Sequence, residues 1–286
     1  MNHPAELAVH QYMESAVKGD TSMSEDTIKQ VASEVAEALT KQFGGGNKRG
    51  DFRLRMSNIG RPTCQLWYDK NKPEIGLPKP TTFIMNMMIG DIVEAVFKGL
   101  LKEARVKYEE PEHVTLELPN AKINGTYDIV IDGAVDDVKS ASNWSYTNKF
   151  ESYDTLASGD SFGYVAQLAG YAKAADKKVG GWWVVNKATG DFKYVRATMD
   201  LEEELAKIEK TVDTVNKNEF KRCFEPEKET FRGKETGNTV LNKNCTFCSY
   251  RFDCFNITEK PAVMSQAKMP KITPYIELAD EYKDAV

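Results

Sequence analysis

The chain has 286 residues, of which 41% are hydrophobic and 28% charged, and its formal net charge is −5. These values are typical of a globular protein and allow one sizeable folded core with a small appended part. The acidic balance argues against a passive nucleic-acid binder, which needs an excess of Lys and Arg to neutralise phosphates. It does not exclude an enzyme that brings positive charge to a phosphate with bound metal ions.

Three absences from the sequence narrow the class further. No run of about 18 apolar residues occurs, so we expect no membrane partner. The first residues, MNHPAELAVHQYMES, lack the basic and apolar parts of a signal peptide, which predicts a cytoplasmic protein. No G-x4-G-K-[ST] phosphate loop is present, which argues against an ATP-driven motor.

Residues 1–50 are expected to form an N-terminal helix and a flexible linker. Apolar residues recur at helical spacing behind Ser24, a typical N-cap residue, and predict a helix over residues 24–43. The glycines at 44–46 end this helix and begin the linker. The residues before Ser24 and the last stretch, 259–286, show little periodicity, so we expect a mobile start and a mobile C-terminal tail.

Residues 51–258 are expected to form the main domain. The pattern predicts helices over residues 64–70, 82–104, 161–175 and 201–220, and strands over residues 113–118, 123–131, 134–139, 182–186 and 192–197. An Asp132-Gly133 turn joins the second and third strands. The first three strands predict an antiparallel meander, so we expect an α/β fold with a central mixed sheet flanked by helices.

Acidic residues on the predicted hairpin indicate a metal site. Side chains alternate along a strand, so Asp137 and Lys139 share one face and Val138 turns to the other. Asp128 on the preceding strand can come close to Asp137, and paired carboxylates suit Mg2+ or Mn2+. Such an ion can polarise a phosphoryl oxygen and activate a water, which Lys139 would position. Of the neighbouring acids, Asp132 fits a turn role and Asp136 a solvated or structural one.

Two predicted helices add polar residues to this site. Glu94 lies on an otherwise apolar helix, where a carboxylate is costly unless it is paired or metal-bound. Asp91 lies on a neighbouring face and is the exposed alternative. Gln167 and Tyr171 are four residues apart on a later helix and project from one face, where they can hydrogen-bond a phosphate or a base. On their own, they would equally fit a polar pair at a helix surface.

Four of the five cysteines indicate a second metal centre. Cys64 stands alone, and Cys245, Cys248 and Cys254 form a C-x2-C-x5-C motif. Four thiolates can hold an iron–sulfur cluster or a structural zinc ion, and either would join two distant segments. Cys223 is left over, and we expect it to be a small buried apolar filler.

The order of these motifs resembles the RecB-type branch of the PD-(D/E)XK nuclease superfamily, specifically the iron–sulfur exonucleases related to the CRISPR-associated four-cysteine nuclease and to the nuclease domain of AddB. That family has G-x3-H, then Asp, (D/E)-x-K and Q-x3-Y, with one cysteine upstream and three downstream. The resemblance covers residues 57–255, with matching parts at Gly90 to Glu94, Asp128, Asp137-Val138-Lys139, Gln167 to Tyr171 and the four cysteines. Glu94 stands where the branch usually has His, although the lambda-exonuclease-like branch uses a carboxylate there.

The resemblance implies a restriction-endonuclease-like core with a helical part clasped by a [4Fe-4S] cluster on Cys64, Cys245, Cys248 and Cys254. It implies Mg2+ or Mn2+ held by Glu94, Asp128, Asp137 and the carbonyl of Val138, with Lys139 also catalytic and with Gln167 and Tyr171 as substrate contacts.

The implied function is a metal-dependent DNA exonuclease acting on single-stranded ends in phage-like recombination, replication or DNA processing. If phage-encoded, it would act in the host cell cytoplasm, alone or with a helicase or recombination partner in trans. The alternatives are a catalytically silent zinc- or cluster-stabilised nucleic-acid-binding subunit and an endonuclease of the same superfamily.

Overall fold

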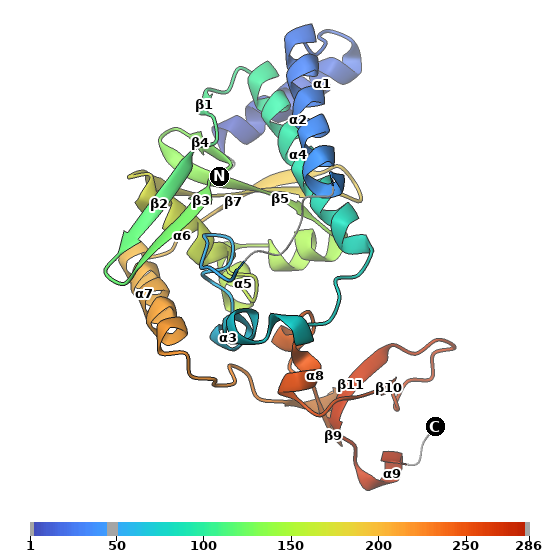
Figure 1. Ribbon diagram of the computed structural model, residues 1–286. Helices are drawn as coiled ribbons and strands as arrows, with labels where there is room; N and C mark the ends of the chain where they lie inside the picture. Colours follow the sequence, from blue (N-terminus) through green and yellow to red (C-terminus); the bar gives the residue numbers. More distant parts are fainter. Residues whose placement is uncertain (1–2, 45–50, 284–286) are drawn as a thin grey trace. The chain divides into compact units, whose positions relative to one another are not determined.

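Figure 1 shows the computed structural model, which describes residues 3–44 and 51–283. The chain divides into two compact units: unit 1 comprises Met1–Gly60 and Pro80–Asp213, and unit 2 comprises Arg61–Lys79 and Thr214–Val286. The segment that carries Cys64 therefore belongs to the same unit as the C-terminal cysteines. Apart from Gly44, the flexible linker expected at residues 44–50 lies outside the described residues.

A mixed sheet forms the centre of unit 1. In the described chain its strand order is β1-β4-β5-β6-β7, with bounds β1 Tyr108–Glu109, β4 Ile129–Ile131, β5 Ala134–Ala141, β6 Lys178–Asn186 and β7 Phe192–Arg196. β5 and β6 pair in parallel and the other neighbours pair antiparallel. A parallel pair needs a long crossover, which here contains a π-helical turn at Ser145–Lys149, α5 (Tyr153–Ser158) and α6 (Tyr164–Ala174). The predicted α/β class with a mixed central sheet is confirmed.

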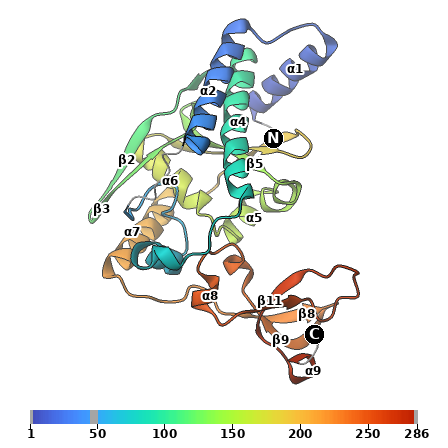
Figure 2. The same cartoon turned by 45° about the vertical axis from the view of Figure 1, so that its right-hand side comes forward.

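Helices cover both faces of this sheet. Figures 1 and 2 show α1 (Pro4–Lys18) and α4 (Thr82–Glu103) on one face, with α2 (Glu25–Phe43) along α4, and α6 and α7 (Leu201–Lys217) on the other. Because side chains alternate along a strand, Trp182 of β6 packs into the core under α6 and α7, and Trp183 packs into the core under α1 and α4. Both rings are fully buried, as expected for core residues.

The N-terminal residues differ from expectation. Helix α2 begins after Ser24, whose side chain accepts a hydrogen bond from the Thr27 amide at 3.3 Å, as predicted. The residues before it, expected to be mobile, form α1. His3 caps this helix by accepting from the Ala5 amide, and its ring lies 5.2 Å from that of Trp183 and 4.6 Å from that of Tyr194. The aromatic contacts that hold α1 come from strands far along the chain, so local periodicity does not reveal them.

The strand predicted over residues 123–131 is broken in two. β3 (Ala121–Thr126) pairs with β2 (His113–Leu118) in a separate two-stranded sheet, and β4 pairs with β1 and β5. The predicted three-strand meander is therefore wrong, although the Asp132-Gly133 hairpin between β4 and β5 is confirmed. This break places Asp128 just before β4 instead of within a strand.

Unit 2 is built from short elements around a small core. Its sheet has the order β10-β11-β9-β8, with bounds β8 Glu227–Phe231, β9 Lys234–Val240, β10 Thr258–Pro261 and β11 Ile272–Glu277. Its helical elements are α3 (Thr63–Asn71), α8 (Arg251–Cys254), α9 (Asp280–Lys283) and 3-10 turns at Pro73–Ile75 and Lys243–Cys245. The expected mobile tail at residues 259–286 thus contributes β11 and most of β10, and β11 pairs with β9.

Candidate active site

Strand β5 presents the predicted acid and lysine on one face. The Asp137 Oδ2 and Lys139 Nζ atoms are 2.5 Å apart, and only 3% and 20% of their side chains are exposed. Val138 turns to the opposite face and packs with Phe97 and Trp183 under α1 and α4. Burial acts to lower the pKa of Lys139, but the carboxylates of Asp137 and Asp128 outweigh it and raise that pKa. Lys139 is therefore a fixed ammonium group beside the acids.

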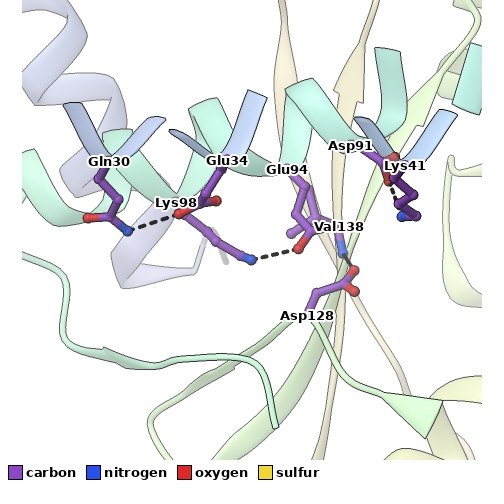
Figure 3. A network of polar contacts seen from close by, with 8 residues as sticks. All are labelled: Gln30, Glu34, Lys41, Asp91, Glu94, Lys98, Asp128 and Val138. Atoms are coloured by element: carbon purple, nitrogen blue, oxygen red, sulfur yellow. Dashed lines mark hydrogen bonds and ion pairs between the residues drawn. The ribbon is translucent and has the colours of Figure 1, made fainter. Parts of the chain in front are cut away.

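Asp128 completes a pair of buried carboxyl groups. Its Oδ2 accepts a hydrogen bond from the Val138 amide at 2.8 Å, which holds the residue against β5 (Figure 3). Burial, and then the charge of Asp137, raise the pKa of Asp128 to about 7, and burial raises that of Asp137. Two carboxyls this close can share a proton or can share a cation.

Glu94 reaches the same group from α4. Burial, followed by the charge of Asp128, raises its pKa, while Lys98 and Lys139 oppose the rise. The Glu94 Oε1 atom lies 2.6 Å from Nζ of Lys98 one helical turn later, and the Lys98 side chain is only 5% exposed (Figure 3). Lys98 is thus the ion-pair partner that the Glu94 carboxylate requires on this apolar helix. Sequence reasoning missed this lysine, although its spacing of four residues was the available signal.

The acidic group suits a divalent cation. Asp137 Oδ2 is buried and faces an ammonium group, yet no donor in the described chain meets it with hydrogen-bond geometry. A buried carboxylate oxygen that lacks such a donor, with two further carboxylates at hand, is a set of hard oxygen ligands suited to Mg2+ or Mn2+. Across the described residues, no three His, Cys, Asp or Glu side chains are already arranged to hold a metal ion. Lys98 and Lys139 pair with Glu94 and Asp137 instead.

Helix α6 brings Gln167 and Tyr171 to the site. Tyr171 is 5% exposed, and Gln167 lies one turn before it on the same helix. Burial raises the pKa of Tyr171 to about 12, and the charges of Asp128 and Asp137 add to the rise. The phenol therefore stays protonated near the carboxyl groups and can act as a donor. The alternative of a polar pair at the helix surface is wrong for Tyr171.

An aromatic and basic cluster that sequence analysis did not predict lies beside Lys139. Lys139 Nζ is 5.2 Å from the ring of Tyr164, and Nζ of Lys149 is 4.5 Å from the same ring and 4.7 Å from that of Phe162. Phe162 is 44% exposed.

Gly163, which lies between Phe162 and Tyr164 in the sequence, adopts a φ of +80° and lies against Gly60. A β-carbon added at Gly163 would lie 2.6 Å from the Gly60 backbone.

The other acidic candidates have structural roles. Asp136 is buried and accepts hydrogen bonds from the Gly181 amide at 2.7 Å, the Tyr194 hydroxyl at 2.8 Å and the Trp183 indole at 3.2 Å. Asp132 occupies the β4–β5 turn with a φ of 51°. Asp91 accepts hydrogen bonds from Lys41 and Gln42, so it joins α2 to α4 outside the site (Figure 3).

The four cysteines of the motif meet in unit 2. Cys64, Cys245, Cys248 and Cys254 line one pocket, together with Tyr68, Tyr250 and Phe255 among others. Burial raises the pKa of the three C-terminal thiols, to about 12 for Cys245. Neutral thiols in an apolar pocket are unfavourable metal ligands until a bound cation stabilises the thiolate form.

Cys223 is not the buried filler that was expected. It is exposed, and its Sγ accepts a hydrogen bond from the Cys64 amide at 3.2 Å and lies 3.4 Å from the Thr63 hydroxyl. A hydrogen bond from the Cys64 side chain lowers the pKa of Cys223 to about 6 and raises that of Cys64. Cys223 is thus a neighbour of the motif and lies outside the lining of its pocket.

Comparisons with known proteins do not assign a family. No family model matches the sequence, and no curated protein matches it. Among solved structures, one described as "Crystal structure of SSO0001" aligns with a TM-score of 0.42 and 13% identity, covering 82% of this chain and 98% of that chain. Within the described residues, every helix is too short or too polar to cross a membrane.

Proposed function

We propose that the protein is a metal-dependent DNA exonuclease of the PD-(D/E)XK type. One observation carries this proposal: Asp137 is buried beside the ammonium of Lys139, and the charges of Asp128 and Glu94 act on the same place. Carboxylates on a hairpin and a helix, with a lysine two residues after the last acid, supply ligands for Mg2+ or Mn2+ and a cation for a phosphate. We interpret the central sheet of unit 1 as the restriction-endonuclease-like core of this superfamily.

The protein groups have separate tasks in this proposal. Glu94, Asp128, Asp137 and the Val138 carbonyl would hold the ion, which when bound supplies Lewis-acid polarisation of a phosphoryl oxygen and an acidic water. The Lys139 ammonium would hold the attacking water in place and stabilise the negative charge that develops on the phosphate. Gln167 and Tyr171 would hydrogen-bond the substrate. Phosphodiester hydrolysis then consumes one water and leaves a phosphate monoester and a hydroxyl.

The cysteine pocket is interpreted as the site of a [4Fe-4S] cluster. In the described chain the four cysteines line one pocket, and four thiolates can hold an iron–sulfur cluster or a zinc ion. The resemblance to the iron–sulfur exonucleases favours the cluster. We propose that the cluster is a structural clasp between α3 and the C-terminal cysteines.

The substrate and setting are also part of the proposal. We expect DNA with single-stranded ends, in phage-like recombination, replication or DNA processing in the cytoplasm, where five cysteines are compatible with a reducing environment. A helicase or recombination protein in trans would supply strand separation.

The test is degradation of end-labelled single-stranded and duplex DNA by anaerobically purified protein with Mn2+, Mg2+ or EDTA. Lys139→Ala should lower the rate by about 100-fold or more and leave the fold intact, because it removes a charge that stabilises the transition state. Lys122→Ala is the matched control, since Lys122 is 73% exposed on the β2–β3 hairpin and pairs only with Glu117. Folded protein that binds DNA and cleaves none would favour the silent binding module, and cleavage of circular DNA would favour an endonuclease.

A further inference from the structure

Lys98 has no task in the proposed reaction, yet it is buried within the acidic group. Its side chain is 5% exposed, and Nζ lies 2.6 Å from Glu94 Oε1. Its charge also acts on Asp128. Burying an ammonium is costly, and α4 could carry an apolar residue at this place, as it does at the neighbouring Phe97 and Leu101. A buried ammonium group on this apolar stretch of α4 therefore calls for an electrostatic explanation.

The charges of the group can be counted. Three carboxyl groups, Glu94, Asp128 and Asp137, face two ammonium groups, Lys98 and Lys139. With all three carboxyl groups ionised, the group has a net charge of −1 in the absence of metal. One divalent cation would change this net charge to +1. A second would leave +3 in a buried site, which is strongly unfavourable.

From this arrangement we propose that Lys98 is an internal counter-cation, which takes the place of a second metal ion and limits the site to one tightly bound divalent cation. This inference rests on the metal site of the proposed function and concerns a positioning residue. The ammonium holds Glu94 in place through a one-turn ion pair on α4 (Figure 3), and it supplies a positive charge that other sites would obtain from a second ion.

The test is the number of Mn2+ ions bound, measured from the free Mn2+ signal in electron paramagnetic resonance at pH 8, with anaerobically purified full-length protein. Wild type should bind one ion that is lost in Asp128→Asn. Lys98→Met, which keeps the length of the side chain and removes its charge, should bind two ions over the same range of free Mn2+. Lys98→Arg keeps the charge and should bind one.

Lys102→Met is the matched control, because Lys102 lies one turn further along α4, is exposed and contacts Gln30 at 2.9 Å. It should bind one ion, like wild type. Two ions in wild type, or one ion in Lys98→Met, would overturn the assignment of Lys98 and leave the nuclease proposal standing. If Lys98→Met does not fold, two ions bound to the wild-type protein would still overturn the assignment. Absence of Mn2+ from both wild type and Lys98→Met would overturn the metal site itself and the inference with it.

Discussion

The two units of the molecule hold their candidate sites in different ways. In unit 1 the site side chains other than Asp128 lie on the longer elements α4, β5 and α6, which are anchored in hydrophobic cores on both faces of the sheet. In unit 2 the cysteines lie on or next to elements of three or four residues, apart from Cys64 on α3. The buried core there is small and includes Cys245 and Cys254 themselves.

This difference indicates what holds the candidate site of each unit in place. Unit 1 pairs Glu94 with Lys98 and Asp137 with Lys139, so these two acidic side chains are held in place without a bound ion. The cluster of buried residues around the cysteines of unit 2 is small, and small folds are often stabilised by a bound metal group. We therefore expect loss of the bound group to affect unit 2 far more than unit 1.

The largest expected effect comes from Cys245→Ala. Loss of one thiolate should abolish the brown colour, release iron and sulfide, and destabilise unit 2 by several kcal/mol, because metal binding is coupled to folding. Hydrogen exchange should rise over residues 227–277 and stay near wild-type values in β5 and β6. Uniform protection in both units would contradict the comparison, and zinc without sulfide in the wild-type protein would overturn the cluster.

Next in size is Trp183→Ala in unit 1. The ring is fully buried among Phe97, Tyr194 and His3, and its indole donates to Asp136. Its removal should cost about 3–5 kcal/mol of unfolding free energy, as is typical of a large aromatic lost from a core. Denaturant unfolding followed by circular dichroism measures the cost. A loss of unfolding free energy below about 1 kcal/mol would show that Trp183 contributes less to the stability of unit 1 than the burial of its ring indicates.

A pH-dependent effect is expected from Asp136. Burial raises its pKa from 3.8 to about 7, so between these values the folded chain keeps a proton that the unfolded chain has released. Stability should therefore fall as pH rises from about 4 to about 7, by up to about 4 kcal/mol from this group. Asp136→Asn should lose this part of the slope, which denaturant unfolding at several pH values in EDTA would show. Parallel slopes for the two proteins would mean that Asp136 is ionised throughout.

The smallest effect is expected for Cys223→Ser, which is the matched control for Cys245→Ala. Cys223 is exposed and lies outside the lining of the cysteine pocket, so iron content should be unchanged and stability should differ by less than about 0.5 kcal/mol. Iron analysis and thermal unfolding check both points. Loss of iron would show that a fifth thiol takes part in the centre.

Local patterns in the sequence predicted the elements that depend on residues close to one another along the chain. Helix α2 with its Ser24 cap, the long α4, and the face shared by Asp137 and Lys139 all follow from capping and from side-chain periodicity. The proximity of Glu94 to Asp128 was also predicted, but through the resemblance and the cost of an unpaired carboxylate.

The parts that the sequence did not predict depend on contacts between distant residues. α1 is held by the packing of His3 against Trp183 and Tyr194, some 180 residues away. β10 and β11 are short and partly polar, and pairing with each other and with β9 defines them. Lys98 looked like any surface lysine on a helix, because only the tertiary fold shows that its ammonium is enclosed by the acidic group.

The close contact between Gly60 and Gly163 should affect the result of a mutational scan. A β-carbon at Gly60 would lie 2.5 Å from the Gly163 α-carbon, and one at Gly163 would lie 2.6 Å from the Gly60 backbone. Neither residue carries a functional group, yet substitutions at both would separate the segment before α3 from the start of α6. In a saturation library selected for activity, these two positions should be as intolerant as Lys139, and a stability measurement would be needed to tell the scaffold from the chemistry.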